Sequence, residues 1–500
     1  MIKRYVNGDV EKIWSDQSKL QKWQEVELAV ILAREQIGIF PAGTYQKIKG
    51  VLALHPIDDK AVAWWKERDE EIHHDLNAFL DERLRYLPVE LHQFWHKGMT
   101  SYDTEEPAMV LLLRESVLQL EGPYQRIRGI LLAMAEKYRY TPMLGRTHGQ
   151  EAKIQSFGKR YLTWLKAFLI AYNEMLGAHK LLSQSKLSGA IGNYQGLTPA
   201  EEAKALGLLG LEPFVGATQI MPRVLYLPLS NSLELIVNSL TQIAEDIRLG
   251  ARSGLPIYQE PFGKKQKGSS AMPHKKNTIT CENQIGMLTM ARNFAQMLRE
   301  RVITWEERAI EQSCVERVAW PDLFHVVMQS FKNMIKVLDG LQVYPDNMML
   351  EIILSRGCYA SEDAKDWLKD KFAALGLAHE DAYRIAQLAS FQAHQISADR
   401  KKIREAEISS HEHADQVLQT KADILIVPAD EINSIESIIE LADLRPLEEL
   451  DIDQARVDIW NRALEQIFSS KENQQSWKQL FTIAYQLRGE PAIYKAFGFK

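Results

Sequence analysis

The stretch LELIVNSLTQIAEDI, residues 233–247, repeats apolar side chains three or four residues apart. The positions that make the pattern are Leu233, Ile236, Val237, Leu240, Ile243, Ala244 and Ile247. This spacing follows one face of an α-helix, and neither glycine nor proline interrupts it. It therefore predicts a long amphipathic helix whose apolar face packs against other helices.

The same pattern recurs on both sides of this stretch. It is carried by Tyr161, Leu165, Phe168, Tyr172, Met175 and Leu176, by Ile285, Leu288, Phe294, Met297 and Leu298, and by Val327, Phe331, Met334 and Leu338. Several helices are therefore expected to exceed the usual mean of about 11–12 residues. Long helices of this kind pack as an up-and-down bundle, so the predicted fold class is mostly α. Few strands are expected, and DILIVPADE, residues 423–431, is the strongest candidate.

Helix-breaking residues divide the chain into three predicted domains. The segment HKGMTSYDTEEPA, residues 96–108, separates a first helical region from the bundle, and GLQVYPDN, residues 340–347, closes the bundle. We predict an N-terminal helical domain over 1–107, a central bundle over 108–345 and a C-terminal helical domain over 346–500. The last fifty or so residues are polar and helical in pattern.

Composition excludes several classes of partner. The chain has 500 residues, of which 46% are hydrophobic and 25% charged, with a formal net charge of −6. Neither nucleic acid nor a membrane is expected to bind such a chain, and no apolar run reaches the roughly 18 residues of a membrane span. The N-terminus lacks the apolar segment of a signal peptide, and the three cysteines form no CxxC pair. We predict a cytoplasmic protein.

Metal and nucleotide-cofactor motifs are missing from the sequence. His411 and His413 flank a glutamate, but no third metal ligand is arranged near them. No P-loop is present, and no GxGxxG follows a predicted strand. We expect neither a metal nor a cofactor.

Three polar segments interrupt the helical pattern: HKGMTSYDTEE (96–106), MLGRTHGQEA (143–152) and QKGSSAMPHKKN (266–277). Each mixes glycine with serine, threonine or histidine at the end of a predicted long helix. Backbone N–H groups at helix ends are free to bind anions, so loops there often carry function. Taken singly, each segment is more simply explained as a solvated connector.

Taken together, the segments resemble the fumarase/aspartase superfamily. GSSAMPHKKN, residues 268–277, is similar to its signature GSSxMPxKxN, and TSYDTEE (100–106) and GRTHGQEA (145–152) resemble two further regions in the same order. The resemblance covers residues 1 to about 400. It implies three helical domains around a central long-helix bundle. It also implies a β-elimination that releases fumarate from a C–N or C–O bond without a cofactor.

The resemblance assigns the chemistry to two residues. Ser269 would be the base that removes a proton from carbon, and His148 the acid that protonates the leaving nitrogen. Glu282 would hold His148 in its charged form, because an acidic neighbour raises the pKa of a histidine. Lys275 and Asn277 would hold the dicarboxylate, and Lys275 would also help to activate Ser269.

The remaining matches line the substrate. They are Thr100 and Ser101 for the succinyl carboxylate, His74, Asp75, His96 and Gln219 for other contacts to the substrate, and Arg4, Tyr5, Arg308, Ser313 and Arg317 for a nucleotide phosphate. Arginine suits phosphate because its planar fork donates two parallel bonds. Arg223 is a further candidate for the site.

Structural readings compete with several of these assignments. Ser269 could be a helix N-cap, and Glu282 could be a first-turn carboxylate favoured by the helix dipole. Arg308 and Arg317 could be surface or inter-helix ion-pair residues, and a lone histidine such as His148 is more often structural. The superfamily match favours the functional reading.

Within the superfamily, the residues that match a phosphate site indicate the branch that acts on succinylated purine nucleotides. The implied substrates are adenylosuccinate, which gives AMP, and the succinylated carboxamide ribotide SAICAR, which gives AICAR. The implied assembly is a homotetramer in which three chains build each active site. There are two alternatives: a lyase that releases fumarate from another amino-succinate, such as argininosuccinate, or an inactive relative that keeps the bundle. The chain departs from the branch pattern at His73, Glu106, Pro107, Thr278, Glu306, Ala309 and Gln312, with effects that the sequence does not define.

Overall fold

The computed structural model describes residues 1–398 and 452–500. It divides into two compact units. Unit 1 contains Met1–Ile130, Trp164–Arg248 and Glu260–Gly340, and unit 2 contains Leu131–Thr163, Leu249–Gln259 and Leu341–Lys500. The strand predicted over 423–431 and the histidines at 411 and 413 lie outside the described residues, and the three-domain division stays a prediction.

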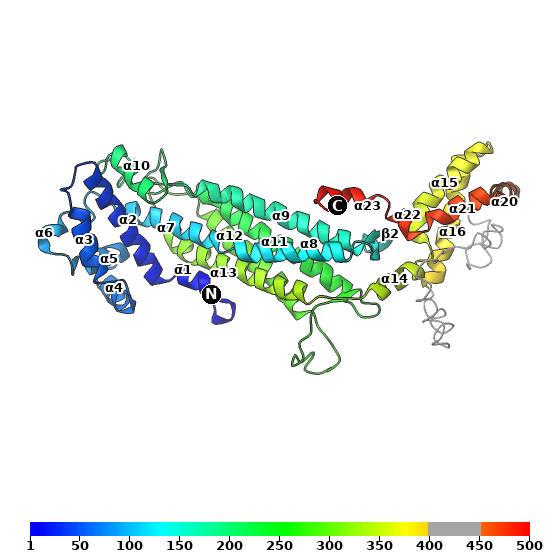
Figure 1. Ribbon diagram of the computed structural model, residues 1–500, viewed down its shortest axis with the longest axis horizontal. Helices are drawn as coiled ribbons and strands as arrows, with labels where there is room; N and C mark the ends of the chain where they lie inside the picture. Colours follow the sequence, from blue (N-terminus) through cyan, green and yellow to red (C-terminus); the bar gives the residue numbers. More distant parts are fainter. Residues whose placement is uncertain (399–451) are drawn as a thin grey trace. The chain divides into compact units, whose positions relative to one another are not determined.

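Long helices dominate, as the apolar periodicity predicts (Figure 1). Among them are α7 (Ser101–Leu118), α8 (Glu121–Lys137), α9 (Phe157–Leu181), α11 (Leu227–Gly250), α12 (Ile279–Glu300) and α13 (Glu311–Asp339). All four patterned stretches fall within α9, α11, α12 and α13, so the predicted mostly α fold is confirmed. The segment GLQVYPDN follows α13 directly, as expected of a breaker.

The core of unit 1 lies between these helices. Every residue of the 233–247 pattern is buried, with 0% of its surface exposed. From α9, the ring of Phe168 packs edge-on against Phe331 of α13, with 6.1 Å between centroids. Burial of one apolar face along several helices stabilises such a bundle far more than helix propensity does.

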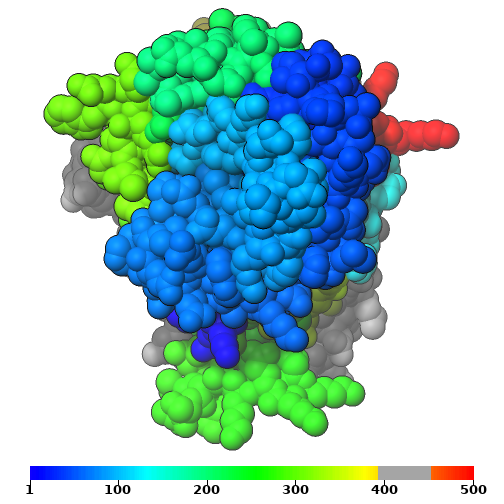
Figure 2. Space-filling model, turned by 90° about the vertical axis from the view of Figure 1, so that its left-hand side faces the viewer, coloured from blue at the N-terminus to red at the C-terminus, as the bar shows by residue number. Residues whose placement is uncertain are grey.

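Further helices complete unit 1. They are η1 (Lys3–Tyr5), α1 (Gly8–Ile13), α2 (Asp16–Gln36), α3 (Thr44–Ala53), α4 (Asp59–Ile72), α5 (Asp75–Leu84), α6 (Val89–His92), α10 (Pro199–Leu208) and η2 (Arg223–Tyr226). Helix α2 packs against α7 and α10. Figure 2 shows this end of unit 1, with the N-terminal helices in blue and the α10 region in green above them.

Unit 2 contains a β-hairpin that the sequence analysis did not predict. Strands β1 (Pro142–Thr147) and β2 (Gln150–Ser156) pair antiparallel, where a polar connector was expected. Leu144 and Ile154 are buried in one apolar cluster with residues of α15 (Ser361–Ala374), α16 (His379–Ala398) and α20 (Gln454–Phe468). Tertiary burial of two apolar side chains thus overrides the polar composition of the segment.

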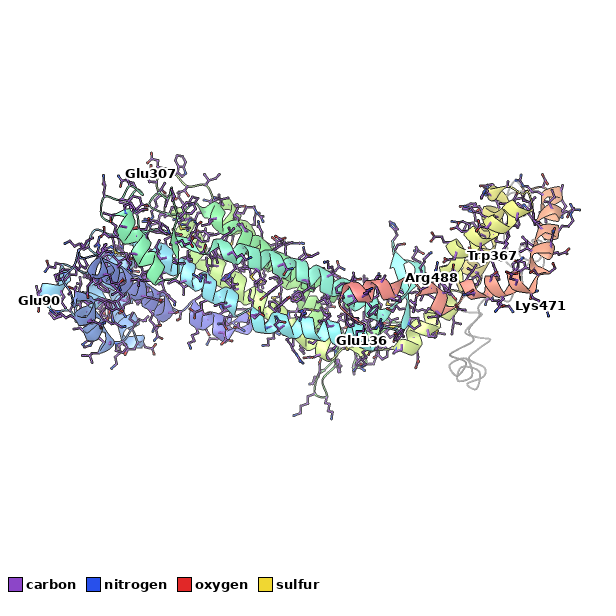
Figure 3. The ribbon with its side chains drawn as sticks, turned by 45° about the horizontal axis from the view of Figure 1, so that its top comes forward. Glu90, Glu136, Glu307, Trp367, Lys471 and Arg488 are labelled. Atoms are coloured by element: carbon purple, nitrogen blue, oxygen red, sulfur yellow. The ribbon has the colours of Figure 1, made fainter. Side chains whose placement is uncertain are left out.

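The other elements of unit 2 are mostly helical. They are β5 (Tyr258–Gln259), β6 (Gln342–Val343), α14 (Pro345–Leu354), η3 (Cys358–Ala360), α21 (Lys471–Leu480), α22 (Ile483–Gln486) and α23 (Glu490–Ala496), while the two-residue strands β3 (Gln184–Ser185) and β4 (Glu212–Pro213) belong to unit 1. Trp367, labelled in Figure 3, packs against Trp477, with 5.1 Å between ring centroids. The helical pattern of the last fifty residues is therefore confirmed.

Neither a membrane-spanning helix nor a metal-binding cluster occurs among the described residues. None of the helices in 1–398 and 452–500 is both long and apolar enough to cross a membrane. Over the same ranges, no group of three or more histidine, cysteine, aspartate or glutamate side chains has an arrangement that could hold a metal ion.

Candidate active site

Four of the predicted substrate-binding residues meet in unit 1. Gln219 Nε2 donates to Thr100 Oγ1 at 3.2 Å, and Gln219 Oε1 accepts from Arg308 Nη1 at 3.1 Å. The same Nη1 lies 3.3 Å from Ser101 Oγ. These residues are far apart in the sequence, but the first turn of α7 carries Thr100 and Ser101 beside the segments that precede α11 and α13.

Arg308 has further neighbours. Its guanidinium carbon lies 4.2 Å from the centroid of the Tyr102 ring. The carbonyl of Glu307, which Figure 3 labels, accepts from Thr218 Oγ1 at 2.7 Å and from the Gln219 N–H at 3.3 Å. A guanidinium beside two hydroxyls and a carboxamide is suited to a carboxylate or a phosphate.

A second cluster of charges surrounds Asp75. Arg317 Nη2 lies 2.6 Å from Asp75 Oδ2, so a predicted phosphate contact is paired with a predicted substrate contact. Burial, and then the negative charge of Asp75, raise the pKa of Glu105 to about 8, against the opposing effect of Arg317. Burial lowers the pKa of Lys19 in the same cluster. The cluster therefore combines two carboxyl groups with several cations.

His96 is bonded to a carboxylate inside unit 1. Its Nδ1 lies 2.7 Å from Oε1 of Glu27, which is completely buried and also accepts from Thr104 Oγ1 at 2.6 Å. Burial alone would lower the pKa of His96, but the charge of Glu27 and its hydrogen bond raise that pKa above the ordinary value. The charged imidazolium is thus favoured here.

Three histidines, two of them in the candidate segments, have left-handed backbones. The φ angles are 52° at His73, 54° at His96 and 54° at His148. Residues other than glycine rarely adopt this region, and each instance costs on the order of 1–3 kcal/mol. His73, one of the departures from the branch pattern, ends α4 in this conformation.

Ser269 is partly exposed and belongs to the segment between β5 and α12, which extends away from the helices in Figure 1. Its Oγ accepts hydrogen bonds from the Ala271 and Met272 N–H groups, both at 3.2 Å. The residue therefore caps a turn of its own loop rather than a helix. Two N–H donors would stabilise negative charge on this oxygen, which is the kind of activation that a serine base needs.

The end of this segment leads into α12. Lys275 is exposed and Asn277 is partly exposed, and among the described residues the hydrogen bonds to Ser269 Oγ come from Ala271 and Met272 rather than from either of these side chains. Glu282 lies in the first turn of α12, 3.9 Å from Arg248 Nη2. This placement matches the alternative in which Glu282 is a first-turn carboxylate favoured by the helix dipole. Buried Glu260 accepts from the Thr280 and Cys281 N–H groups, each at 3.1 Å, and so caps α12.

His148 belongs to unit 2, where it occupies the two-residue turn of the β1–β2 hairpin. Gly149 follows with a φ of 78°, so both turn residues have positive φ, as type I′ hairpin turns require. His148 is exposed, and its side chain is accessible to a substrate or to another chain.

The remaining predicted residues are distributed over unit 1. His74 caps α5 by accepting from the Asn77 N–H at 3.2 Å. Tyr5 Oη accepts from Asn283 of α12 at 3.3 Å, whereas Arg4 has no ion-pair partner among the described residues. Ser313 is buried at the start of α13, where its hydroxyl donates to its own turn.

Arg223 belongs to the interior of unit 1. It is buried between Glu106 and Glu316, and Tyr226 Oη also donates to Glu106. Glu106, one of the positions at which the chain departs from the branch pattern, thus completes a buried ion network. This environment explains Arg223 as a structural residue.

Several residues around the site were not identified from sequence. They are Glu27 as the partner of His96, the buried Lys186 and Asp103, and Glu105. Asp103 and Glu105 stood within a quoted motif, so closer attention to that motif could have found them. Lys186 offered no signal, because a lysine in a short polar run is usually solvated.

The chain is similar to known proteins of one enzyme family. A profile of the lyase family matches residues 10–292. The adenylosuccinate lyase of Thermotoga maritima is 34% identical over 77% of this chain and 87% of its own length. That of Synechocystis sp. is 35% identical over 79% of this chain and 89% of its own length.

Solved structures share the fold. A fumarate lyase from Mesorhizobium sp. BNC1 superposes with a TM-score of 0.69 at 22% identity, over 92% of this chain and 98% of its own. A 3-carboxy-cis,cis-muconate lactonizing enzyme from Pseudomonas putida does so with a TM-score of 0.67 at 20% identity, over 95% and 98%.

The long-helix bundle and the family match define a lyase of the fumarase/aspartase type. The chain belongs to the lyase family whose profile it matches, and so to the fumarase/aspartase superfamily.

Proposed function

We propose that this enzyme releases fumarate from adenylosuccinate, giving AMP, and from SAICAR, giving AICAR. The observation that carries the proposal is the meeting of Thr100, Ser101, Gln219 and Arg308 in one hydrogen-bonded cluster. Relatives with 34–35% identity over most of their length are adenylosuccinate lyases, which supports the same substrate.

In the proposed reaction, Ser269 removes a proton from the carbon next to a carboxylate of the succinyl group. Negative charge then develops on that carboxylate, and Lys275 and Asn277 stabilise it. The N–H groups of Ala271 and Met272, which donate to Ser269 Oγ, support the ionised hydroxyl. Closure of the loop over substrate would exclude water and strengthen these interactions.

The C–N bond breaks as the carbon–carbon double bond of fumarate forms. His148 donates its proton to the leaving nitrogen, and Glu282 would keep the imidazole charged before that step. Thr100, Ser101 and Gln219 bind the succinyl carboxylates, with His74, Asp75 and His96 around them. Arg4, Tyr5, Arg308, Ser313 and Arg317 bind the phosphate. No metal or cofactor takes part in this scheme.

The site requires more than one chain. Helix α12 has 22 residues and so spans about 33 Å at 1.5 Å per residue. It separates Asn277, at its start, from Arg308, beyond its end. A single chain therefore keeps the serine loop away from the arginine cluster, and we propose a homotetramer in which three chains complete each site.

A substrate panel tests this function. The purified protein is incubated with adenylosuccinate, SAICAR, argininosuccinate and aspartate, and fumarate release is followed by absorbance. Turnover of the two purine substrates is expected, with a kcat/KM well above that for the substrates without phosphate. A higher kcat/KM for argininosuccinate than for the two purine substrates would identify argininosuccinate as the substrate instead. Inactivity on all four, in a protein that is folded, would favour an inactive relative.

A further inference from the structure

Lys186 is completely buried in unit 1 and has no part in the reaction described above. Its ammonium group offers three N–H donors. Three oxygens surround it: Asp103 Oδ1 at 2.7 Å, the carbonyl of Gly189 at 3.1 Å and the carbonyl of Gln219 at 3.0 Å. Every donor of the buried ammonium therefore has an acceptor.

Its partner Asp103 is also completely buried and equally well bonded. Besides Lys186, its Oδ1 accepts from the Gly189 N–H at 3.1 Å, and its Oδ2 accepts from the Thr100 N–H at 2.9 Å. Gly189 has a φ of 84°, a conformation in which its N–H reaches the carboxylate and its carbonyl reaches the ammonium. The ion pair is thus part of a closed hydrogen-bond network.

The network ends at two residues proposed to hold the succinyl group. Lys186 fixes the backbone of Gln219, and Asp103 fixes the backbone of Thr100. The side chains of Thr100 and Gln219 are then 3.2 Å apart and hydrogen-bonded to each other. A buried pair with fully satisfied bonds specifies one geometry, because any displacement leaves a charge unpaired in the interior.

We propose that Lys186 and Asp103 are positioning residues for substrate binding, acting through Gln219 and Thr100 without contacting the substrate. This inference rests on the proposed function, which assigns Gln219 and Thr100 to the succinyl carboxylates. Loss of the ammonium would free the 219 segment and misalign the amide that Arg308 and Thr100 also contact.

The test compares Lys186→Met, Gln219→Ala and the double variant with adenylosuccinate as substrate. Misplaced binding groups reduce efficiency steeply, so KM is expected to rise roughly 10- to 100-fold in Lys186→Met. A smaller change in kcat is expected, since the base and the acid are untouched. Because Lys186 acts through Gln219, the double variant is expected within about twofold of Gln219→Ala alone.

Arg83→Met is the matched control. Arg83 is also completely buried, pairs with Glu82 and donates to the carbonyl of His55 at 2.8 Å, and among the described residues none of its hydrogen bonds or ion pairs involves a proposed site residue. Its loss is expected to lower stability while leaving KM unchanged in the folded protein. A rise in KM with Lys186→Met alone would therefore separate positioning from general destabilisation.

An unchanged KM in Lys186→Met would overturn the inference. So would a double variant in which the rise in KM equals the product of the two single rises, because the two residues would then act independently. If Lys186→Met does not fold, Lys186→Met/Asp103→Leu, which leaves neither charge buried, is measured against the same criteria. A wild-type protein that releases no fumarate would refute the proposed function, whereas an active wild type with an unaffected Lys186→Met refutes only the positioning role.

Discussion

Arg308 lies beside Ser101, Gln219 and the ring of Tyr102, all neutral groups. Its guanidinium can therefore bind an anion without first breaking an ion pair, in contrast to Arg317, which is bonded to Asp75. Removing one charge-assisted contact to a phosphate or carboxylate weakens binding substantially.

Arg308→Ala is accordingly expected to raise KM for adenylosuccinate by roughly 10- to 100-fold, with Arg308→Lys intermediate because a lysine lacks the planar fork. Steady-state fumarate release measures the effect. Arg299→Ala on the exposed part of α12, which pairs with Glu234 instead, is the control and should behave like wild type. Equal KM values for all variants would exclude Arg308 from binding.

Glu105 makes stability depend on pH. Its pKa of about 8 in the folded protein lies above the ordinary 4.5, because the carboxyl is buried near Asp75, with Lys19, Arg308 and Arg317 opposing. The proton is therefore bound more tightly in the folded state. The stabilising contribution is complete below pH 4.5 and is lost as pH rises through about 8.

Glu105→Gln removes this ionisation. Relative to wild type, its melting temperature should increase steadily between pH 5 and pH 9, as measured by thermal unfolding monitored by circular dichroism. Exposed Glu90→Gln serves as control and should show no such trend. A Glu105→Gln difference that stays constant over this range would contradict the assignment.

Motif comparison located Thr100, Ser101, Gln219 and Arg308, which the fold does bring together. The same comparison gave no signal for Lys186 and did not identify Glu27 as the partner of His96, since both roles arise from burial and from partners distant in the sequence. Arg223 illustrates the opposite error: its residue type suits an anion site, yet both its partners are buried carboxylates.

At the level of elements, apolar periodicity was sufficient to predict α9, α11, α12 and α13, but it did not predict the β1–β2 hairpin. The strands are short, and their outer ends at Arg146, Thr147 and Gln150 are exposed, so no clear alternation of apolar and polar residues develops. The sequence signal that remained was His148–Gly149, a dipeptide that suits a turn with two positive φ angles.

Glu260 connects the two ends of the serine loop. It precedes the loop, and its carboxylate accepts from Thr280 and Cys281, which follow it. Because it satisfies N–H groups at the start of α12, Glu260→Ala should lower the free energy of unfolding by about 1–3 kcal/mol. Urea denaturation measures this loss, and Glu260→Gln, which keeps an acceptor, should lose less. An Ala variant as stable as wild type would contradict the capping role.

At the level of the whole molecule, Ser269 and His148 belong to different compact units. The length of α12 further separates the serine loop from Arg308 within one chain. Both facts follow from the long helices, which the sequence predicts, but the number of chains does not follow from helical periodicity. The proposed tetramer rests on the superfamily resemblance and on the incompleteness of the site within one chain.

Mixing two inactive variants tests the shared site most directly. Ser269→Ala and His148→Ala are each expected to lose roughly 100- to 10,000-fold in kcat, the usual contribution of a general base or acid. After joint denaturation and refolding at equal concentrations, about a quarter of the sites should receive an intact serine and an intact histidine from different chains. Fumarate release from adenylosuccinate should then recover to about that fraction of wild type. Mixed assemblies that form but stay as inactive as the separate variants would contradict the account.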